Sequence, residues 1–77
     1  MTTAELRAII RAAAEAAGAA RHVWQNGLGF DWRGWEYTIS ERPESLGQWY
    51  AYKRHTLLHG TGETPQQARK NARPFAV

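Results

Sequence analysis

Aromatic and basic side chains alternate closely in the second half of this 77-residue chain, and their chemistry is that of a binding surface. Aromatic rings stack on nucleobases and cations neutralise phosphates, whereas Trp, Tyr and Arg also dominate the binding energy of protein interfaces. Packing of the tyrosines in the core fits the same pattern, so the residue types leave all three interpretations open. The residues that we predict to contact a partner are Trp32, Arg33, Tyr50, Tyr52, Lys53, Arg54, Arg69, Lys70 and Arg73.

No set of side chains in the sequence is spaced for catalysis. Ser40 and Ser45 lie in a polar segment without the glycine-flanked turn of a nucleophile elbow, and the chain contains no cysteine. Glu41 and Glu44 are close in sequence, but a solvated loop does not give a carboxylate pair the contrasting environments of an acid and a base. We therefore predict a protein that is not an enzyme and uses no cofactor.

Histidine spacing gives a weak metal signal. His55 and His59 are four residues apart, and period-two geometry would place both on one face of a single strand. A closed zinc site needs four nitrogen or sulfur ligands, and His22 is the one further histidine. We predict no metal site.

Gly60 and Gly62 precede a segment with helix-start chemistry. Backbone N–H groups in such a loop can hold a phosphate, but Glu63 beside them would repel an anion. We interpret the two glycines as the turn that takes the chain from a strand into a helix.

Length and composition indicate a small single domain spanning residues 1–77. Nine large aromatic residues are more than such an interior holds, so some should lie on the surface. The formal charge of +3 favours acidic partners only mildly. No apolar run approaches the roughly 20 residues of a membrane span, and the absence of cysteine fits a reducing compartment. We expect a cytoplasmic protein with no membrane contact.

The N-terminal segment is typical of an amphipathic helix over about residues 3–20. Thr2 and Glu5 have capping-box spacing, Leu6 and Ile10 fall on one face, and Gly18 fits the helix end. The helix should pack on a sheet.

The central segment predicts an antiparallel sheet over about residues 30–60. Residues 35–39 alternate cleanly, with Glu36 and Thr38 facing away from the core, and residues 31–34 fit a type I turn or a bulge. Residues 40–47 read as a long hairpin loop. Residues 48–59 form either one strand or two strands, with a kink near Lys53 and Arg54.

The C-terminal segment predicts a helix over about residues 64–73, with Thr64 as N-cap, Pro65 in the first turn and Gln67 completing a capping box. We expect residues 75–77 to fold back as an apolar tail. The order is thus α-β-β-(β)-α, an α+β fold with a small antiparallel sheet and flanking helices. An exposed strand edge can pair two copies, so we expect a monomer or a homodimer.

The spacing of Gly60, Gly62, Thr64, Ala68 and Arg69 resembles the end of the double-stranded RNA-binding domain. That family runs α-β-β-β-α and binds phosphates with lysines at the start of its second helix. Here those positions are Pro65 and Gln66, and only Arg69 matches a basic position. The resemblance implies a similar fold, and it makes direct RNA or DNA binding the alternative function.

Two further resemblances concern the C-terminal half and the chain as a whole. Residues 35–73, with Gly62, Thr64, Pro65 and Asn71, resemble the hairpin and helix of HicB-type antitoxins. A short, cysteine-free, aromatic-rich domain without a catalytic set is also similar in character to phage-encoded inhibitors, including anti-CRISPR proteins. The latter resemblance implies docking onto a host protein or nucleoprotein complex. We therefore predict a phage- or mobile-element-encoded inhibitor that acts by binding.

Overall fold

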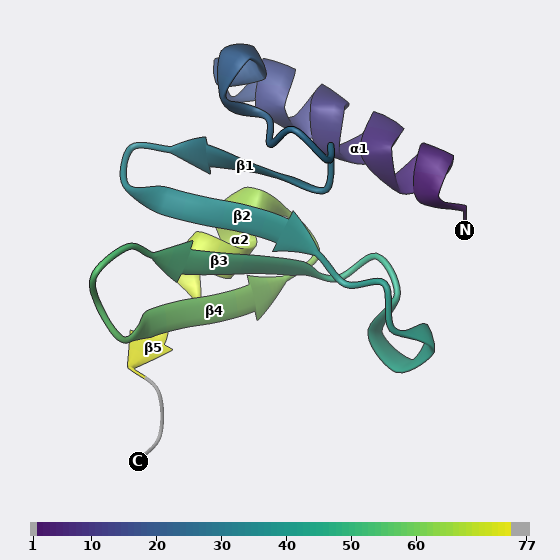
Figure 1. The fold of residues 1–77 in the computed structure, drawn as a ribbon. Coiled ribbons are helices and arrows are strands. Elements are labelled where there is room, and N and C mark those ends of the chain that lie inside the picture. Colours follow the sequence, from purple (N-terminus) through teal and green to yellow (C-terminus); the bar gives the residue numbers. More distant parts are fainter. Residues whose placement is uncertain (1, 75–77) are drawn as a thin grey trace.

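The computed structural model describes residues 2–74, which form two helices and one five-stranded sheet (Figure 1). The predicted apolar tail at residues 75–77 lies outside the described residues. Strands β1 to β5 pair antiparallel in sequence order, which confirms the predicted α+β class. The elements are α1 (Thr3–Ala16), the 3-10 turn η1 (Ala20–His22), β1 (Gly29–Trp32), β2 (Trp35–Ile39), η2 (Pro43–Ser45), β3 (Trp49–Lys53), β4 (Leu58–Gly62), α2 (Pro65–Lys70) and β5 (Arg73–Pro74).

Both helices cover the same face of the sheet. Helix α1 contacts β1 and β2, whereas α2 contacts β3 and β4; in Figure 1, α2 lies behind the sheet. The core packs between these layers and is centred on Phe30, which stacks on Tyr37 with ring centroids 5.0 Å apart and meets Trp49 edge-on at 6.2 Å. The buried apolar residues are Leu6, Ile10, Ala14, Ala19, Phe30, Tyr37, Ile39, Trp49, Ala51 and Ala68. Burying a side chain as large as Ile10 stabilises the fold by about 1.5–3 kcal/mol.

Helix α1 has the predicted start but ends earlier than predicted. The Thr2 hydroxyl accepts from the Glu5 N–H and the Glu5 carboxylate accepts from the Thr2 N–H, which makes the capping box complete. The predicted extension to about residue 20 is wrong because Gly18 takes a left-handed φ of 79°. The Ala19 N–H then donates to the Ala14 carbonyl, which closes the helix in a Schellman motif.

The hairpin between β1 and β2 turns at Arg33 and Gly34, and the type I turn or bulge predicted for residues 31–34 is wrong. The φ angles are 53° at Arg33 and 87° at Gly34, and Trp32 pairs directly with Trp35. Positive φ at both central residues defines a type I′ turn, which matches the twist of the strands that it joins. Phe30, Trp32 and Trp35 therefore lie on the same side of the sheet.

Residues 48–59 form two strands, β3 and β4, joined by a turn over residues 54–57. The kink predicted near Lys53 and Arg54 is the start of this turn, in which His55 has a φ of 60°. His55 and His59 thus lie in a turn and on β4, and the prediction that both share one strand face does not apply. The Arg54 N–H donates to the Gly34 carbonyl at 2.9 Å, which ties the two hairpin turns together.

Gly60 and Gly62 lie inside β4 and do not form the predicted turn into the helix. A Cβ on Gly60 would come within 2.1 Å of the Ala68 carbonyl oxygen, so the missing side chain lets α2 sit directly on the strand. Helix α2 is also shorter than predicted, because Arg73 pairs with His59 as part of β5. The Gln67 side chain accepts from the Glu63 N–H, one residue before the position expected for a capping box.

The helices of the described chain, residues 2–74, are too short and too polar to cross a membrane.

Candidate binding surfaces

The face of the sheet opposite the helices, here called the open face, is covered by neither helix. Strand register places its side chains in two cross-strand rows, because residues of opposite parity to the core point away from α1 and α2. None of these side chains is fully buried, so the face is accessible. The side chains of the open face are those of Trp24, Asp31, Glu36, Thr38, Tyr50, Tyr52, His59, Thr61 and Arg73.

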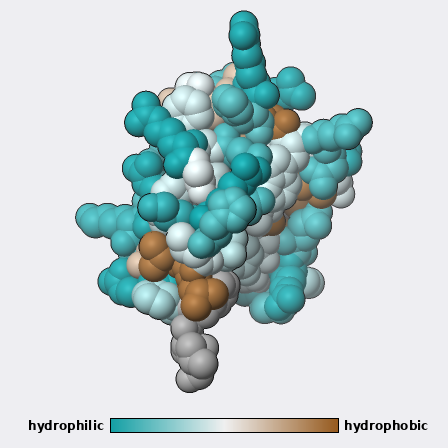
Figure 2. All heavy atoms as spheres, turned by 60° about the vertical axis from the view of Figure 1, so that its left-hand side comes forward, coloured by the Kyte–Doolittle hydropathy of each residue, from teal (hydrophilic) through white to brown (hydrophobic). Residues whose placement is uncertain are grey.

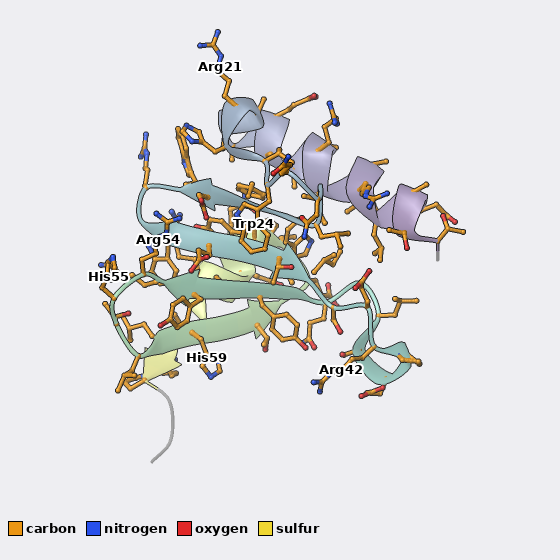
Figure 3. All side chains as sticks on the ribbon, in the orientation of Figure 1. Arg21, Trp24, Arg42, Arg54, His55 and His59 are labelled. Atoms are coloured by element: carbon orange, nitrogen blue, oxygen red, sulfur yellow. The ribbon has the colours of Figure 1, made fainter. Side chains whose placement is uncertain are left out.

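Trp24 is the aromatic anchor at the β1 side of the open face. Val23 forms an isolated bridge with Phe30 and packs against the core, so the next side chain projects to the opposite side of the sheet (Figure 3). The indole lies against Gly29, where a Cβ would stand only 2.7 Å from two ring carbons. Its Nε1–H donates to Asp31 Oδ1 at 3.0 Å. The ring is therefore held in a fixed orientation and remains half-exposed.

Asp31 links this anchor to the second hairpin. Its other carboxylate oxygen accepts from Arg54 Nη2 at 2.8 Å, with side-chain exposures of 33% for Asp31 and 50% for Arg54. An ion pair this exposed contributes at most about 1 kcal/mol to stability. Its main effect is geometric, because it orients the carboxylate that holds the Trp24 indole.

Tyr50 and Tyr52 project from β3, two strands and roughly 10 Å away from the strand under Trp24. Hydrogen bonds with the Ser45 and Ser40 hydroxyls lower the pKa of Tyr50, which shows that its phenol is directed toward the β2–β3 loop. Tyr50 also forms one wall of a hollow of about 380 Å³ whose other walls include residues 40–42. The Tyr50 hydroxyl therefore lies near the Ser40 and Ser45 hydroxyls, which are 2.7 Å apart.

A second surface lies on the helix-covered side. The end of α1 and the start of α2 leave a groove of about 230 Å³, here called the inter-helix groove. The rings of Phe30, Trp32 and Tyr37 line it, together with the guanidinium groups of Arg33 and Arg69.

The sheet separates the nine predicted contact residues. Tyr50, Tyr52 and Arg73 belong to the open-face rows, and Arg54 reaches that face through Asp31. On the helix-covered side, Lys53 Nζ lies 5.9 Å from the centroid of Trp35, and Lys70 is exposed on α2. Trp32, Arg33 and Arg69 line the inter-helix groove. The single aromatic and basic patch expected from the sequence is therefore two surfaces.

Sequence reasoning missed Trp24 as a surface residue. Trp24 comes directly after Val23, which forms an isolated bridge and is not part of a strand. No alternating strand pattern therefore predicts the direction of the Trp24 side chain. The spacing from Trp24 to Gly29 and Asp31 is the one available signal, since Gly29 leaves room for the indole and Asp31 offers its N–H an acceptor.

The exposed aliphatic side chains of the described residues do not form a further binding surface. Figure 2, which brings the two hairpin turns forward, shows a mostly hydrophilic side with a small hydrophobic cluster. The large aliphatic residues exposed in the described chain lie on three separate segments: Ile9 on α1, Leu46 in the β2–β3 loop and Leu57 in the β3–β4 turn.

Residues 2–74 contain no group of three or more His, Asp and Glu side chains placed to share a metal ion. Ser40 is buried, and its hydroxyl lies 2.7 Å from that of Ser45. Both hydroxyls belong to the network around Tyr50.

Comparisons with protein-family models, with curated proteins and with solved structures find no significant match. The resemblances to the double-stranded RNA-binding domain, to HicB-type antitoxins and to phage inhibitors stay predictions.

Proposed function

We propose that this chain is a non-enzymatic binding protein that docks onto a protein partner through the open face. The fixed orientation of the Trp24 indole, packed on Gly29 and hydrogen-bonded to Asp31, carries the proposal. A half-exposed ring that is already ordered loses little side-chain entropy on binding, and Trp and Tyr are the residues that most often dominate interfaces. Tyr50 adds a second partly exposed ring, whose hydroxyl lies near the Ser40 and Ser45 hydroxyls.

The charges of the open face favour a protein over a nucleic acid. Asp31 pairs with Glu36 across β1 and β2, and Glu36 pairs with Tyr52 across β2 and β3, so two carboxylates lie beside the aromatic anchors. These carboxylates would repel a phosphate backbone. Arg54 already pairs with Asp31 at 2.8 Å, and Arg73 lies at the far end of the same row, beyond His59.

The helix-start positions that carry phosphate-binding lysines in double-stranded RNA-binding domains also argue against the alternative function. They are Pro65, which is buried, and Gln66, which is uncharged. Direct RNA or DNA binding therefore remains the second outcome of the experiment below.

We further propose that docking inhibits the partner, a host protein or nucleoprotein complex. The basis is the resemblance in character to phage-encoded inhibitors, because a small domain that binds a larger machine can act by occluding its surface. The expected setting is a phage or another mobile element.

A capture experiment with charge-matched variants tests the open face. Thr61→Arg places a long cation on the open face, whereas Ala12→Arg makes the same charge change on the exposed side of α1. The wild type and Ala12→Arg should recover the same protein from nuclease-treated host lysate. Thr61→Arg and Tyr52→Ala should lose it.

In a parallel capture from lysate without nuclease, recovery of nucleic acid alone would replace the protein partner with the alternative function. Undiminished capture by Thr61→Arg would move the interface away from the open face.

A further inference from the structure

The inter-helix groove is lined by aromatic rings that are packed against the core and against the end of α1. Phe30 is fully buried and stacks on Tyr37, and both belong to the central core. Trp32 lies under the end of α1 and contacts His22 with ring centroids 5.7 Å apart. The groove is therefore a preformed feature of the fold.

Two guanidinium groups reach this groove from different elements. Arg33, in the β1–β2 turn, holds its guanidinium carbon 5.1 Å from the centroid of the Trp32 ring, a cation–π distance. Arg69 projects from α2 toward the Tyr37 hydroxyl; burial raises the pKa of Tyr37, and the Arg69 charge partly offsets that rise.

These two charges have no carboxylate partner in the described chain. Within residues 2–74, the ion pair closer than 4.0 Å is that of Arg54 with Asp31. The groove is lined by aromatic, small and uncharged residues besides the two arginines. Its positive charge is therefore available to a ligand.

We propose that the inter-helix groove binds an aspartate or glutamate side chain from an acidic segment of a protein partner. A planar guanidinium fork matches a carboxylate through paired hydrogen bonds, and the aromatic floor lowers the local dielectric around that pair. At about 230 Å³, the groove is smaller than the roughly 300–1,000 Å³ of sites for drug-sized ligands, so it suits one side chain rather than a nucleotide. This site lies on the opposite side of the sheet from the open face, and it is independent of the function proposed above.

An NMR titration with the peptide N-acetyl-hexaglutamate amide tests the proposal. The probe should shift the Trp32 indole N–H and the Nε–H signals of Arg33 and Arg69 saturably, and the hexaglutamine peptide should leave them in place. Arg69→Gln should weaken binding about tenfold, because a charged hydrogen-bonded pair is lost. Lys70→Gln, the same charge change one residue along α2, should change affinity by less than about twofold.

Arg33→Gln gives an independent test, since this side chain lies in an exposed turn and its replacement leaves the core intact. Three results would overturn the assignment: equal losses from Arg69→Gln and Lys70→Gln, tighter binding of inorganic phosphate than of the glutamate peptide, or shifts centred on Trp24. Thr61→Arg should leave the titration unchanged, so failure at the groove and failure at the open face are distinguishable.

Discussion

One added methyl group at Gly60 should separate α2 from the sheet. An alanine Cβ there would stand 2.1 Å from the Ala68 carbonyl oxygen, 2.6 Å from the Ala72 nitrogen and 2.8 Å from the Ala72 Cα. All three atoms are backbone, so no side chain can rotate away. The helix end must retreat by roughly 1 Å, which is overpacking of a kind that typically costs about 1–3 kcal/mol.

We expect Gly60→Ala to lie at the upper end of that range, about 3 kcal/mol, because the closest contact is with rigid backbone. A chain of 77 residues has a total stability of roughly 4–12 kcal/mol, so the loss is a large fraction of it. The midpoint of thermal unfolding should fall by roughly 12–24 °C. Circular dichroism during heating and urea titration followed by tryptophan fluorescence measure both quantities.

Gly34→Ala is the matched control. Gly34 has a φ of 87°, but no atom lies within 4 Å of the Cβ that alanine would add. Its cost should be the left-handed backbone penalty alone, about 1 kcal/mol. If Gly60→Ala destabilised the protein no more than Gly34→Ala, the close seating of α2 on β4 would be refuted.

Four further predictions follow from the hydrogen bonds at the helix start and on the open face. Thr2→Ala should cost about 1 kcal/mol of unfolding free energy through loss of the N-cap. The backbone N–H of Thr2, with its hydroxyl as a smaller contributor, lowers the pKa of Glu5, so the carboxylate stabilises the fold above its ordinary pKa. This contribution is lost as pH falls through the lowered value, and the stability difference between wild type and Glu5→Gln in urea titrations should vanish in acid. Asp31→Ala should cost about 1–2 kcal/mol because the indole and a guanidinium both lose their acceptor, whereas Arg54→Ala should cost less than about 1 kcal/mol; equal losses in thermal unfolding would contradict the linking role of the carboxylate. Alkaline titration of tyrosine absorbance should find Tyr50 ionising below the ordinary range, and replacing its two serine partners with alanine should remove that shift.

Local sequence signals predicted the parts of the fold that depend on neighbours along the chain. The capping box at Thr2 and Glu5 involves residues three apart, and both hydrogen bonds form as expected. The alternation of residues 35–39 placed Glu36 and Thr38 away from the core because a strand allows no other arrangement.

Contacts between segments that are distant in the sequence could not be predicted from local patterns. Gly60 resembles a turn residue in sequence, but its role depends on Ala68 of a helix that comes later in the chain. The type I′ turn at Arg33 has a positive φ at a residue other than glycine, asparagine or aspartate, so composition gives little warning of it.

The division of the candidate site also arises from three-dimensional contacts. Tyr50 and Arg69 fall on opposite sides of the sheet because β3 register and the placement of α2 are both set by the core. In the sequence, aromatic and basic residues lie close together, but the pleat of the strands places them on opposite sides of the sheet. Trp24 was not predicted as a surface residue because the direction of its side chain depends on the bridge between Val23 and Phe30.

Hydroxyl-radical footprinting of the complex with the captured protein tests the open face most directly. Trp24 and Tyr52 should become protected on binding, whereas Trp35, half-buried on the helix-covered side, should react as it does in the free protein. Protection of Trp35 with unchanged reactivity of Trp24 and Tyr52 would contradict the proposal that the open face is the docking surface.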